Sequence, residues 1–268
     1  MKHTLITLLL LFTTLCAHAQ YDIMEAKCNV VPGAYNFWLY TPEDYYYTQE
    51  STPVIIFLHG ASLCGNNLNR VRRYGLLDAI EKGREIPAIV IAPQNPGETW
   101  NPHKINKILD WTIENFAVDT TRVYVLGMSL GGYGTMDYAG TYPERVAAAM
   151  ALCGGCTLKN QTRLGEVPLW IMHGTADRAV SVNESKVVVG RLQATDNDSR
   201  LRYDWLKGSS HGALARVFYL NETLDWLFSH SLLDEGRPVN RDIIIGKQHL
   251  SNAYKDIPRD TADPEIVQ

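Results

Sequence analysis

The sequence of 268 residues lacks runs of lysine or arginine, and its 25 basic and 29 acidic residues leave a formal net charge of −4. A chain with this charge pattern has no continuous basic surface for phosphates, so nucleic acid is a poor candidate partner. Low-complexity tracts and blocks of like charge are also absent, while 46% of the residues are hydrophobic. This composition excludes disorder for most of the chain and suits one large folded core.

No apolar run reaches the roughly 20 residues that a membrane-spanning helix needs. A shorter run from Leu5 to Leu15 follows Lys2 and precedes Ala17-His18-Ala19. A cation, a short apolar stretch and a small-x-small motif in this order are typical of a secretory signal peptide. We therefore predict cleavage after Ala19, export to the periplasm or the medium, and no stable membrane insertion.

Cysteine is scarce, and one of the five residues, Cys16, lies in the predicted signal peptide. Cys153-Gly-Gly-Cys156 lacks a second pair of ligands at metal-binding spacing, so we predict no metal site. Cys28, Cys64, Cys153 and Cys156 allow three disulfide pairings in an exported protein. We expect Cys64 to pair with Cys153 or Cys156, because their loops should leave the same edge of the sheet; free buried thiols are the alternative.

From Pro53 onward, apolar runs rich in β-branched residues alternate with segments of helical period, which is typical of a mostly parallel sheet with helices on both faces. Strands are predicted at 54–60, 88–94, 123–129, 147–155, 167–174 and 200–208, and helices near 66–82, 103–117, 130–141, 182–195 and 212–229. Residues 21–45 alternate apolar and polar, which predicts one or two antiparallel edge strands. The predicted organisation is a signal peptide at 1–19, one α/β catalytic domain at 20–230 and an irregular extension at 231–268.

The motif Gly127-Met128-Ser129-Leu130-Gly131 lies between a predicted strand and a predicted helix. In this context Gly-x-Ser-x-Gly forms a strained turn that exposes the serine hydroxyl at the start of the helix. A hydroxyl needs a base to take its proton and an acid to orient that base. HGTAD at 173–177 and SHG at 210–212 follow later strands, in the expected order of acid and base. We therefore assign Ser129 as nucleophile, Asp177 as acid and His211 as base.

Other titratable residues near these motifs have simpler explanations. His173 is expected to form local hydrogen bonds in its strand-end turn, and His59 to brace the loop that follows the first parallel strand. Asp119 reads as a turn residue that pairs with Arg122. Asp137 is expected on the solvent-facing side of its helix, so none of these residues belongs to the predicted triad.

The remaining site predictions concern the oxyanion and the substrate. Two backbone N–H donors should meet the oxyanion, and we assign them to Leu130 and Ala61, with Ser62 as the alternative to Ala61. Ser62, Trp100 and Gln94 are predicted to bind substrate, with Trp100 as a flat platform for a sugar or phenolic ring. A tryptophan that covers the crossover helix is the alternative for Trp100.

These motifs give the chain a resemblance to the α/β-hydrolase superfamily, and within it to secreted esterases related to feruloyl and acetyl-xylan esterases and to polyhydroxybutyrate depolymerases. The residues that carry it are His59-Gly60, GMSLGG at 127–132, HGTAD at 173–177 and SHG at 210–212. Residues 118–134 also resemble the nucleophile region of the phospholipase/carboxylesterase and prolyl-oligopeptidase groups. The resemblance implies hydrolysis of esters or amides by Ser129, Asp177 and His211 without a cofactor.

Only a short stretch separates the predicted strand that ends near Gly155 from the one that begins near Val167, which leaves no room for a cap domain. An open cleft suits bulky or polymeric esters. We predict a serine carboxylesterase that acts through an acyl-enzyme on bulky or carbohydrate-linked esters, feruloyl or acetyl. A prolyl-oligopeptidase-like serine peptidase and a catalytically inactive binding module are the alternatives.

Overall fold

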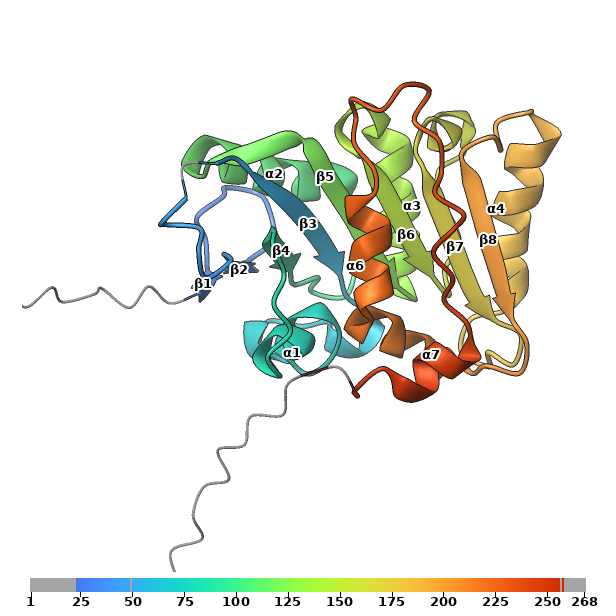
Figure 1. The fold of residues 1–268 in the computed structure, drawn as a ribbon, viewed down its shortest axis with the longest axis horizontal. Coiled ribbons are helices and arrows are strands. Elements are labelled where there is room, and N and C mark those ends of the chain that lie inside the picture. Colours follow the sequence, from blue (N-terminus) through green and yellow to red (C-terminus); the bar gives the residue numbers. More distant parts are fainter. Residues whose placement is uncertain (1–22, 49, 256, 258–268) are drawn as a thin grey trace, which may run out of the picture.

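The computed structural model describes residues 23–48, 50–255 and 257, so the predicted signal peptide lies outside the described residues. The strands of this part are β1 (Met24–Lys27), β2 (Phe37–Tyr40), β3 (Thr52–Leu58), β4 (Ile89–Pro93), β5 (Val118–Met128), β6 (Ala148–Leu152), β7 (Leu169–Gly174) and β8 (Leu201–Leu206). They form one sheet in the order β1-β2-β4-β3-β5-β6-β7-β8 (Figure 1). β2 is antiparallel to both its neighbours, and all other pairs are parallel.

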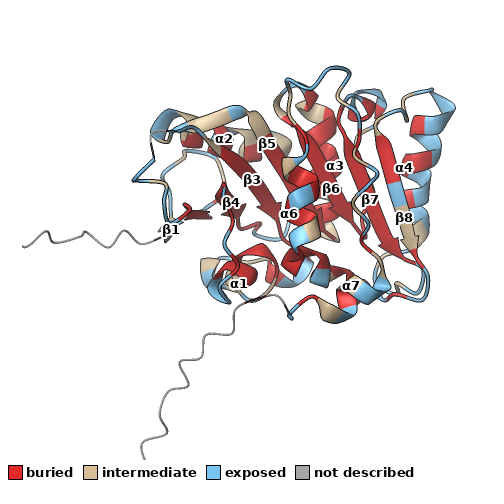
Figure 2. Cartoon of the chain, in the orientation of Figure 1, coloured by how far each residue is buried: buried red, intermediate tan, exposed pale blue. Residues whose placement is uncertain are grey.

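Helices cover both faces of this sheet. They are α1 (Leu76–Glu81), α2 (Pro102–Asn115), α3 (Leu130–Thr141), α4 (Val182–Ala194), α5 (His211–Leu214), α6 (Asn221–Phe228) and α7 (Lys247–Asn252). Apolar residues of α2, α3 and α4 pack in one core, and those of α1, α6 and α7 pack in the other (Figure 1). The central strands are therefore buried on both sides (Figure 2), which explains their continuous apolar runs. The predicted α/β fold class and the antiparallel edge strands are confirmed.

Two predicted helices are broken in the structure. The segment near 66–82 forms a 3₁₀ helix, Leu68–Arg72, and then α1. Between them Gly75 has a φ of 89°, and a β-carbon there would lie 2.4 Å from the ring of Phe57. The predicted helix near 212–229 is divided into α5, the 3₁₀ helix Ala215–Tyr219 and α6. The extended Leu220 (φ −88°, ψ 139°) separates the 3₁₀ helix from α6.

The chain after α6 packs against the core. It contains α7, where the sequence predicted irregular structure, and Val239, Ile245 and Leu250 are buried. His230 ties the start of this segment down, since its Nδ1 lies 2.7 Å from the Trp226 carbonyl oxygen and its Nε2 accepts the Asn240 N–H at 3.0 Å. Within the described residues, no helix has the length and apolar character needed to cross a membrane.

The first turn of α3 lies directly on the ends of two strands. A β-carbon on Gly131 would come within 1.8 Å of the Leu58 carbonyl oxygen in β3, and one on Gly132 within 2.5 Å of the Leu152 carbonyl oxygen in β6. Contacts this short leave no space for any side chain, so only glycine allows the helix to begin here. The close contact of α3 with β3 and β6 therefore fixes the position of Ser129, the residue just before this turn.

We expect Gly131→Ala to lower the free energy of unfolding by at least about 3 kcal/mol, because the added methyl group collides with backbone that cannot rotate away. Gly190→Ala is the matched control, since Gly190 is exposed in α4 and a β-carbon there would have nothing within 4 Å. This control should gain up to about 1 kcal/mol from helix propensity. Urea unfolding of both variants measures the difference, and equal stabilities would contradict the packing argument.

Candidate active site

Ser129 occupies a strained turn between β5 and α3. Its φ of 60° and ψ of −123° lie in a region that residues with a β-carbon rarely adopt. Its N–H donates to the Leu152 carbonyl oxygen at 2.8 Å, and this bond anchors the turn to β6. A β-carbon on Gly127 would lie 2.5 Å from the carbonyl oxygens of Gly131 and Leu58, so the motif's first glycine is also required by close packing. The turn therefore has the geometry expected for an exposed nucleophile.

Asp177 and His211 meet across the ends of β7 and β8. The Nδ1 of His211 lies 2.6 Å from Asp177 Oδ2. Their loops are joined by two further hydrogen bonds, from the Thr175 N–H to the Leu206 carbonyl oxygen at 3.0 Å and from the Gly208 N–H to Thr175 Oγ1 at 2.9 Å. The Asp177 side chain is fully buried, whereas that of His211 is 24% exposed. The imidazole thus turns one nitrogen to a buried carboxylate and leaves the other for the cleft.

The Asp177 carboxylate is held in its charged form. Burial by itself would raise the pKa of Asp177, but hydrogen bonds from the Val180 N–H, His211, the Ala179 N–H and the Cys153 thiol lower it below its usual value. The two backbone donors lie 2.9 Å and 2.8 Å from Oδ1. An ionised carboxylate at this position can orient the imidazole and stabilise the imidazolium.

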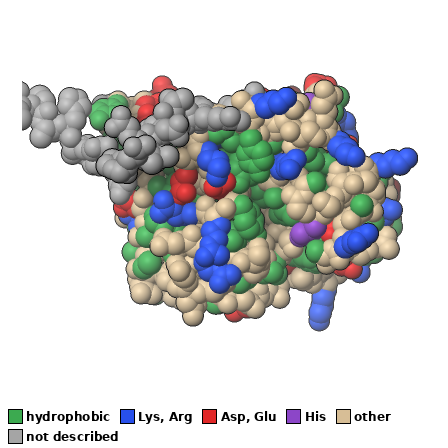
Figure 3. All heavy atoms as spheres, turned by 90° about the horizontal axis from the view of Figure 1, so that it is seen from below, with side chains coloured by type: hydrophobic (Ala, Val, Ile, Leu, Met, Phe, Trp, Pro, Cys, Tyr) green, Lys and Arg blue, Asp and Glu red, His purple; other side chains and the backbone are tan. Residues whose placement is uncertain are grey.

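A cavity of about 470 Å³ opens beside these residues, and both Ser129 and His211 line it. Most of its wall is apolar or aromatic, and Tyr74, Ala215 and Phe218 line it together with residues at the strand ends. Figure 3 views the edge of the sheet toward which the parallel strands point and shows an apolar hollow with a histidine at its side. No motif in the sequence pointed to these three wall residues, because they come from a loop and a 3₁₀ helix that carry no recognisable pattern.

The loop after β3 brings further backbone donors to the cavity. Ala61 begins a 3₁₀ helix (Ala61–Leu63) and Leu130 begins α3, so neither N–H has an acceptor within its own helix. A β-carbon on Gly60, the residue before Ala61, would lie 3.5 Å from Ser129 Cβ, which places this loop beside the nucleophile. The assignment of Ala61 and Leu130 as oxyanion donors stays a prediction.

His59 braces the loop, as expected. Its Nδ1 lies 2.8 Å from the Gly60 carbonyl oxygen and its Nε2 accepts the Asn95 N–H at 3.0 Å, so Nδ1 carries the proton. Burial lowers the pKa of His59 to about 4. The ring is therefore neutral at pH 7 and serves as a rigid link between two loops.

The predicted substrate-binding residues separate in the structure. Ser62 lines the cavity, and its hydroxyl group contacts that of Tyr74. Trp100 does not line it: the indole is 2% exposed and packs edge-on against Tyr35 and His59. Gln94 is buried as well, and its amide donates to the carbonyl oxygens of two residues in the neighbouring loop. The predicted substrate contacts of Trp100 and Gln94 are therefore corrected, since both side chains support the wall from behind.

Of the alternative titratable residues, Asp137 differs from expectation. It is 1% exposed and accepts hydrogen bonds from the N–H and hydroxyl groups of Thr157 at 2.7 Å and 2.6 Å. The chain between β6 and β7 covers this side of α3, which helical periodicity could not predict. Asp119 pairs with Arg122 at 2.6 Å, as predicted.

The predicted disulfide is also wrong, because all four described cysteines are free. Cys153 is buried against Asp177 and Cys156 lies beside Asp137, so each thiol has a carboxylate neighbour in place of Cys64. Sheet topology brings the loops to one edge, but the direction of each side chain is decided by local packing.

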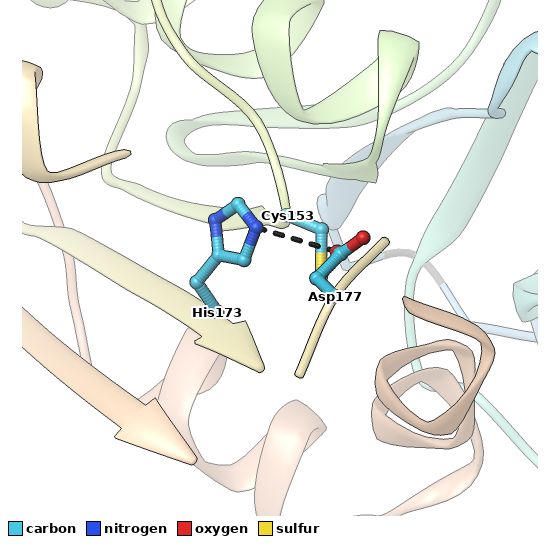
Figure 4. Close-up of side chains that lie close together, drawn as sticks. All are labelled: Cys153, His173 and Asp177. Carbon is cyan, nitrogen blue, oxygen red and sulfur yellow. Dashed lines mark ion pairs between the residues drawn. The ribbon is translucent and has the colours of Figure 1, made fainter. Parts of the chain in front are cut away.

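Cys153, His173 and Asp177 place one thiol, one imidazole and one carboxylate within 4.8 Å of one another (Figure 4). Their hydrogen bonds favour a network of protonated donors over a metal site. The Val180 carbonyl oxygen, 3.0 Å from His173 Nε2, can only accept, so this nitrogen carries a proton and offers no lone pair. Burial raises the pKa of the Cys153 thiol, which keeps the sulfur protonated as well.

Comparison with known proteins agrees with this geometry. A family model described as "Putative esterase" matches residues 29–204. The chain belongs to this esterase family. The family confirms the predicted resemblance and the predicted enzyme class, that of the carboxylic ester hydrolases.

Individual relatives match over shorter stretches. Acetylxylan esterase A of Emericella nidulans is 37% identical over 87 residues, which are 25% of this chain and 29% of that protein. A probable acetylxylan esterase A of Aspergillus clavatus is 26% identical over 158 residues, 52% of this chain and 50% of the relative. The chain thus spans half or less of the length of these curated relatives.

Solved structures share the α/β-hydrolase fold. The crystal structure of a thermostable esterase is 26% identical, with a TM-score of 0.65 over 78% of this chain and 64% of that one. An acetyl xylan esterase from Aspergillus awamori has a TM-score of 0.55 at 15% identity, over 70% of this chain and 93% of that one. At that identity the second likeness concerns the fold alone.

The buried neutral histidine His59 makes stability depend on pH. The unfolded chain protonates this residue near its ordinary pKa of 6.5 and the folded chain only near 4, so the free energy of unfolding should fall as the pH decreases between these values. The contribution of His59 is about 3 kcal/mol. Burial lowers the pKa of His173 and His230 too, which adds to the fall.

Urea unfolding of the native protein and His59→Gln at several pH values measures this dependence. Glutamine does not titrate, so the variant should lose less stability between pH 6.5 and pH 4 than the native protein does, although it is less stable at pH 7. Parallel curves for the two proteins would contradict the assignment.

Proposed function

We propose that this protein is a serine carboxylesterase in which Ser129, His211 and Asp177 form the catalytic triad. The observation that carries the proposal is the strained Ser129 turn facing the same cavity as an imidazole that is bonded to a buried carboxylate at 2.6 Å. Membership of the esterase family supports the same reaction class. No cofactor takes part in this mechanism.

In the proposed reaction, Ser129 Oγ attacks the ester carbonyl carbon while its proton passes to His211 Nε2. The N–H groups of Ala61 and Leu130 donate to the oxygen that becomes negative, and Asp177 stabilises the imidazolium. Collapse of the tetrahedral intermediate breaks the ester C–O bond, and the leaving alcohol takes the proton from His211. Water then repeats the sequence on the acyl-enzyme and releases the carboxylic acid.

We further propose that the substrates are bulky or carbohydrate-linked esters, and that aromatic acyl groups such as feruloyl fit the cleft better than acetyl. The cavity of about 470 Å³ is far larger than an acetyl group, and its wall includes Tyr74, Phe57 and Phe218. The connection between β6 and β7 holds one 3₁₀ helix, Thr162–Glu166, in the part of the chain that the structure describes. A connection of this kind leaves the cleft accessible to a polymer.

The features of residues 1–19 lead us to propose export as well, with the signal peptide removed after Ala19. Export suits an enzyme whose substrate is attached to a polysaccharide outside the cell. Relatives named acetylxylan esterase are consistent with such a substrate.

Ser129→Ala should reduce kcat by a factor on the order of 10⁴ to 10⁶ while leaving the fold intact, because it removes the attacking oxygen and little volume. His211→Ala should lose activity on a comparable scale, and Asp177→Asn somewhat less. Hydrolysis of p-nitrophenyl esters measures the loss, and labelling by a fluorophosphonate identifies the nucleophile. More than about a tenth of native turnover in Ser129→Ala would exclude this serine as the nucleophile.

Activity should increase with pH as His211 loses its proton, because only the neutral imidazole accepts the Ser129 proton. A chelator should leave the rate unchanged. The measurement is kcat/KM against pH, with and without EDTA. Loss of activity with EDTA that a divalent metal restores would contradict the cofactor-free mechanism.

A larger side chain in the cleft should slow the hydrolysis of esters with large acyl groups more than that of esters with small ones. Ala215 lines the cavity, so Ala215→Trp should reduce kcat/KM for feruloyl esters at least tenfold, a cost of about 1.4 kcal/mol, and change it little for acetyl esters. Ala194→Trp, at the exposed end of α4, is the matched control. Equal losses on both substrates would place the acyl group elsewhere.

A further inference from the structure

The buried side of Asp177 has donors that the proposed mechanism does not use. His211, which lines the cleft, lies 2.6 Å from one oxygen of this carboxylate. Cys153, just after β6, and His173, in β7, also lie close to the carboxylate (Figure 4). Both side chains are fully buried, so neither can touch a substrate. Their only route to the chemistry is through Asp177.

Cys153 is held in place by its backbone. It follows β6 directly, its N–H donates to the Met172 carbonyl oxygen at 2.9 Å, and its φ is 49°. A left-handed φ is uncommon for a residue with a side chain. In this conformation the thiol sulfur lies within 4.8 Å of the Asp177 carboxylate (Figure 4).

His173 supplies a second donor from β7. Its Nε2 lies 3.0 Å from the Val180 carbonyl oxygen, which can only accept, so this nitrogen carries a proton. The same Nε2 lies 3.3 Å from Asp177 Oδ2. On the other side of the ring, Nδ1 lies 2.8 Å from Ser185 Oγ, which fixes the orientation of the imidazole. Oδ2 is also the oxygen that His211 contacts. His173 therefore places a second N–H group 3.3 Å from the oxygen that His211 contacts.

We propose that Cys153, together with His173, is a positioning residue that draws part of the Asp177 negative charge away from His211 and so sets the pH at which the base becomes neutral. This inference rests on the proposed triad. The titratable groups that face the carboxylate are His211 from α5, His173 from β7 and Cys153 from the end of β6; its other donors are N–H groups of its own loop. Fewer donors on Asp177 leave more charge to stabilise the protonated form of His211.

The test is the pH profile of kcat/KM on a p-nitrophenyl ester. Cys153→Ala removes the donor, and the acid limb should move to higher pH by roughly 0.5 to 1 unit. Cys153→Ser keeps a donor on the same left-handed backbone and should keep the native limb. Cys156→Ala is the matched control, because that thiol is half-buried in the same connection but faces Asp137.

A merely structural role for Cys153 would lower the melting temperature without moving the limb. An acid limb of the kcat/KM profile that does not move in Cys153→Ala overturns the inference, and so does an equal movement in Cys156→Ala. One equivalent of tightly bound zinc in the native protein that is lost in Cys153→Ser also overturns it. Activity that survives Ser129→Ala overturns the proposed function instead, so the two failures are distinguishable.

If Cys153→Ala does not fold, the Raman S–H stretching band replaces the kinetic measurement. The band of Cys153, identified by its loss in Cys153→Ser, should lie at lower frequency than that of the exposed Cys28 and should shift upward in Asp177→Asn. A band unchanged by Asp177→Asn shows no hydrogen bond and overturns the inference.

Discussion

The structure depends on a contact between backbones, in which the first turn of α3 rests on the carbonyl oxygens at the ends of β3 and β6. Gly131 and Gly132 make it possible, because a β-carbon at either position would overlap those oxygens. The short distance forces the chain to reverse within one residue between β5 and α3. Ser129 occupies that residue, and its φ of 60° is the local consequence.

A second constraint joins the acid to the base. Asp177 and His211 lie on different loops. Hydrogen bonds from Thr175 to Leu206 and from Gly208 to Thr175 join these two loops, in addition to the contact between the two side chains. The carboxylate accepts hydrogen bonds from the Ala179 and Val180 N–H groups of its own loop and contacts His211, and Cys153 and His173 lie close to it. Such a network keeps a buried charge satisfied, and it also fixes the direction in which His211 points.

The cleft wall has a different origin. Tyr74, Ala215 and Phe218 come from segments near Gly75 and Leu220, where two predicted helices are interrupted. In continuous helices these side chains would lie on a regular helix face. With the helices interrupted, they line the same cavity as the residues at the strand ends. The catalytic groups therefore depend on strand-end loops with clear motifs, and the substrate surface depends on irregular segments without them.

The sequence by itself determined the class of fold, the order of the parallel strands with helices α2, α3 and α4 between them, and the three residues of the candidate triad. Apolar periodicity and the spacing of Gly, Ser, Asp and His reflect local backbone requirements, which a sequence records directly. The sequence did not determine which way side chains point toward residues that are distant in the chain. Trp100 and Gln94 turn into the wall, Asp137 is covered by Thr157, and Cys153 faces Asp177 instead of a second thiol. Only the tertiary structure decided these contacts, because each depends on which distant segment fills the space beside a residue. The hydrophobic pattern of a sequence indicates that a position is buried, but not which residue lies next to it.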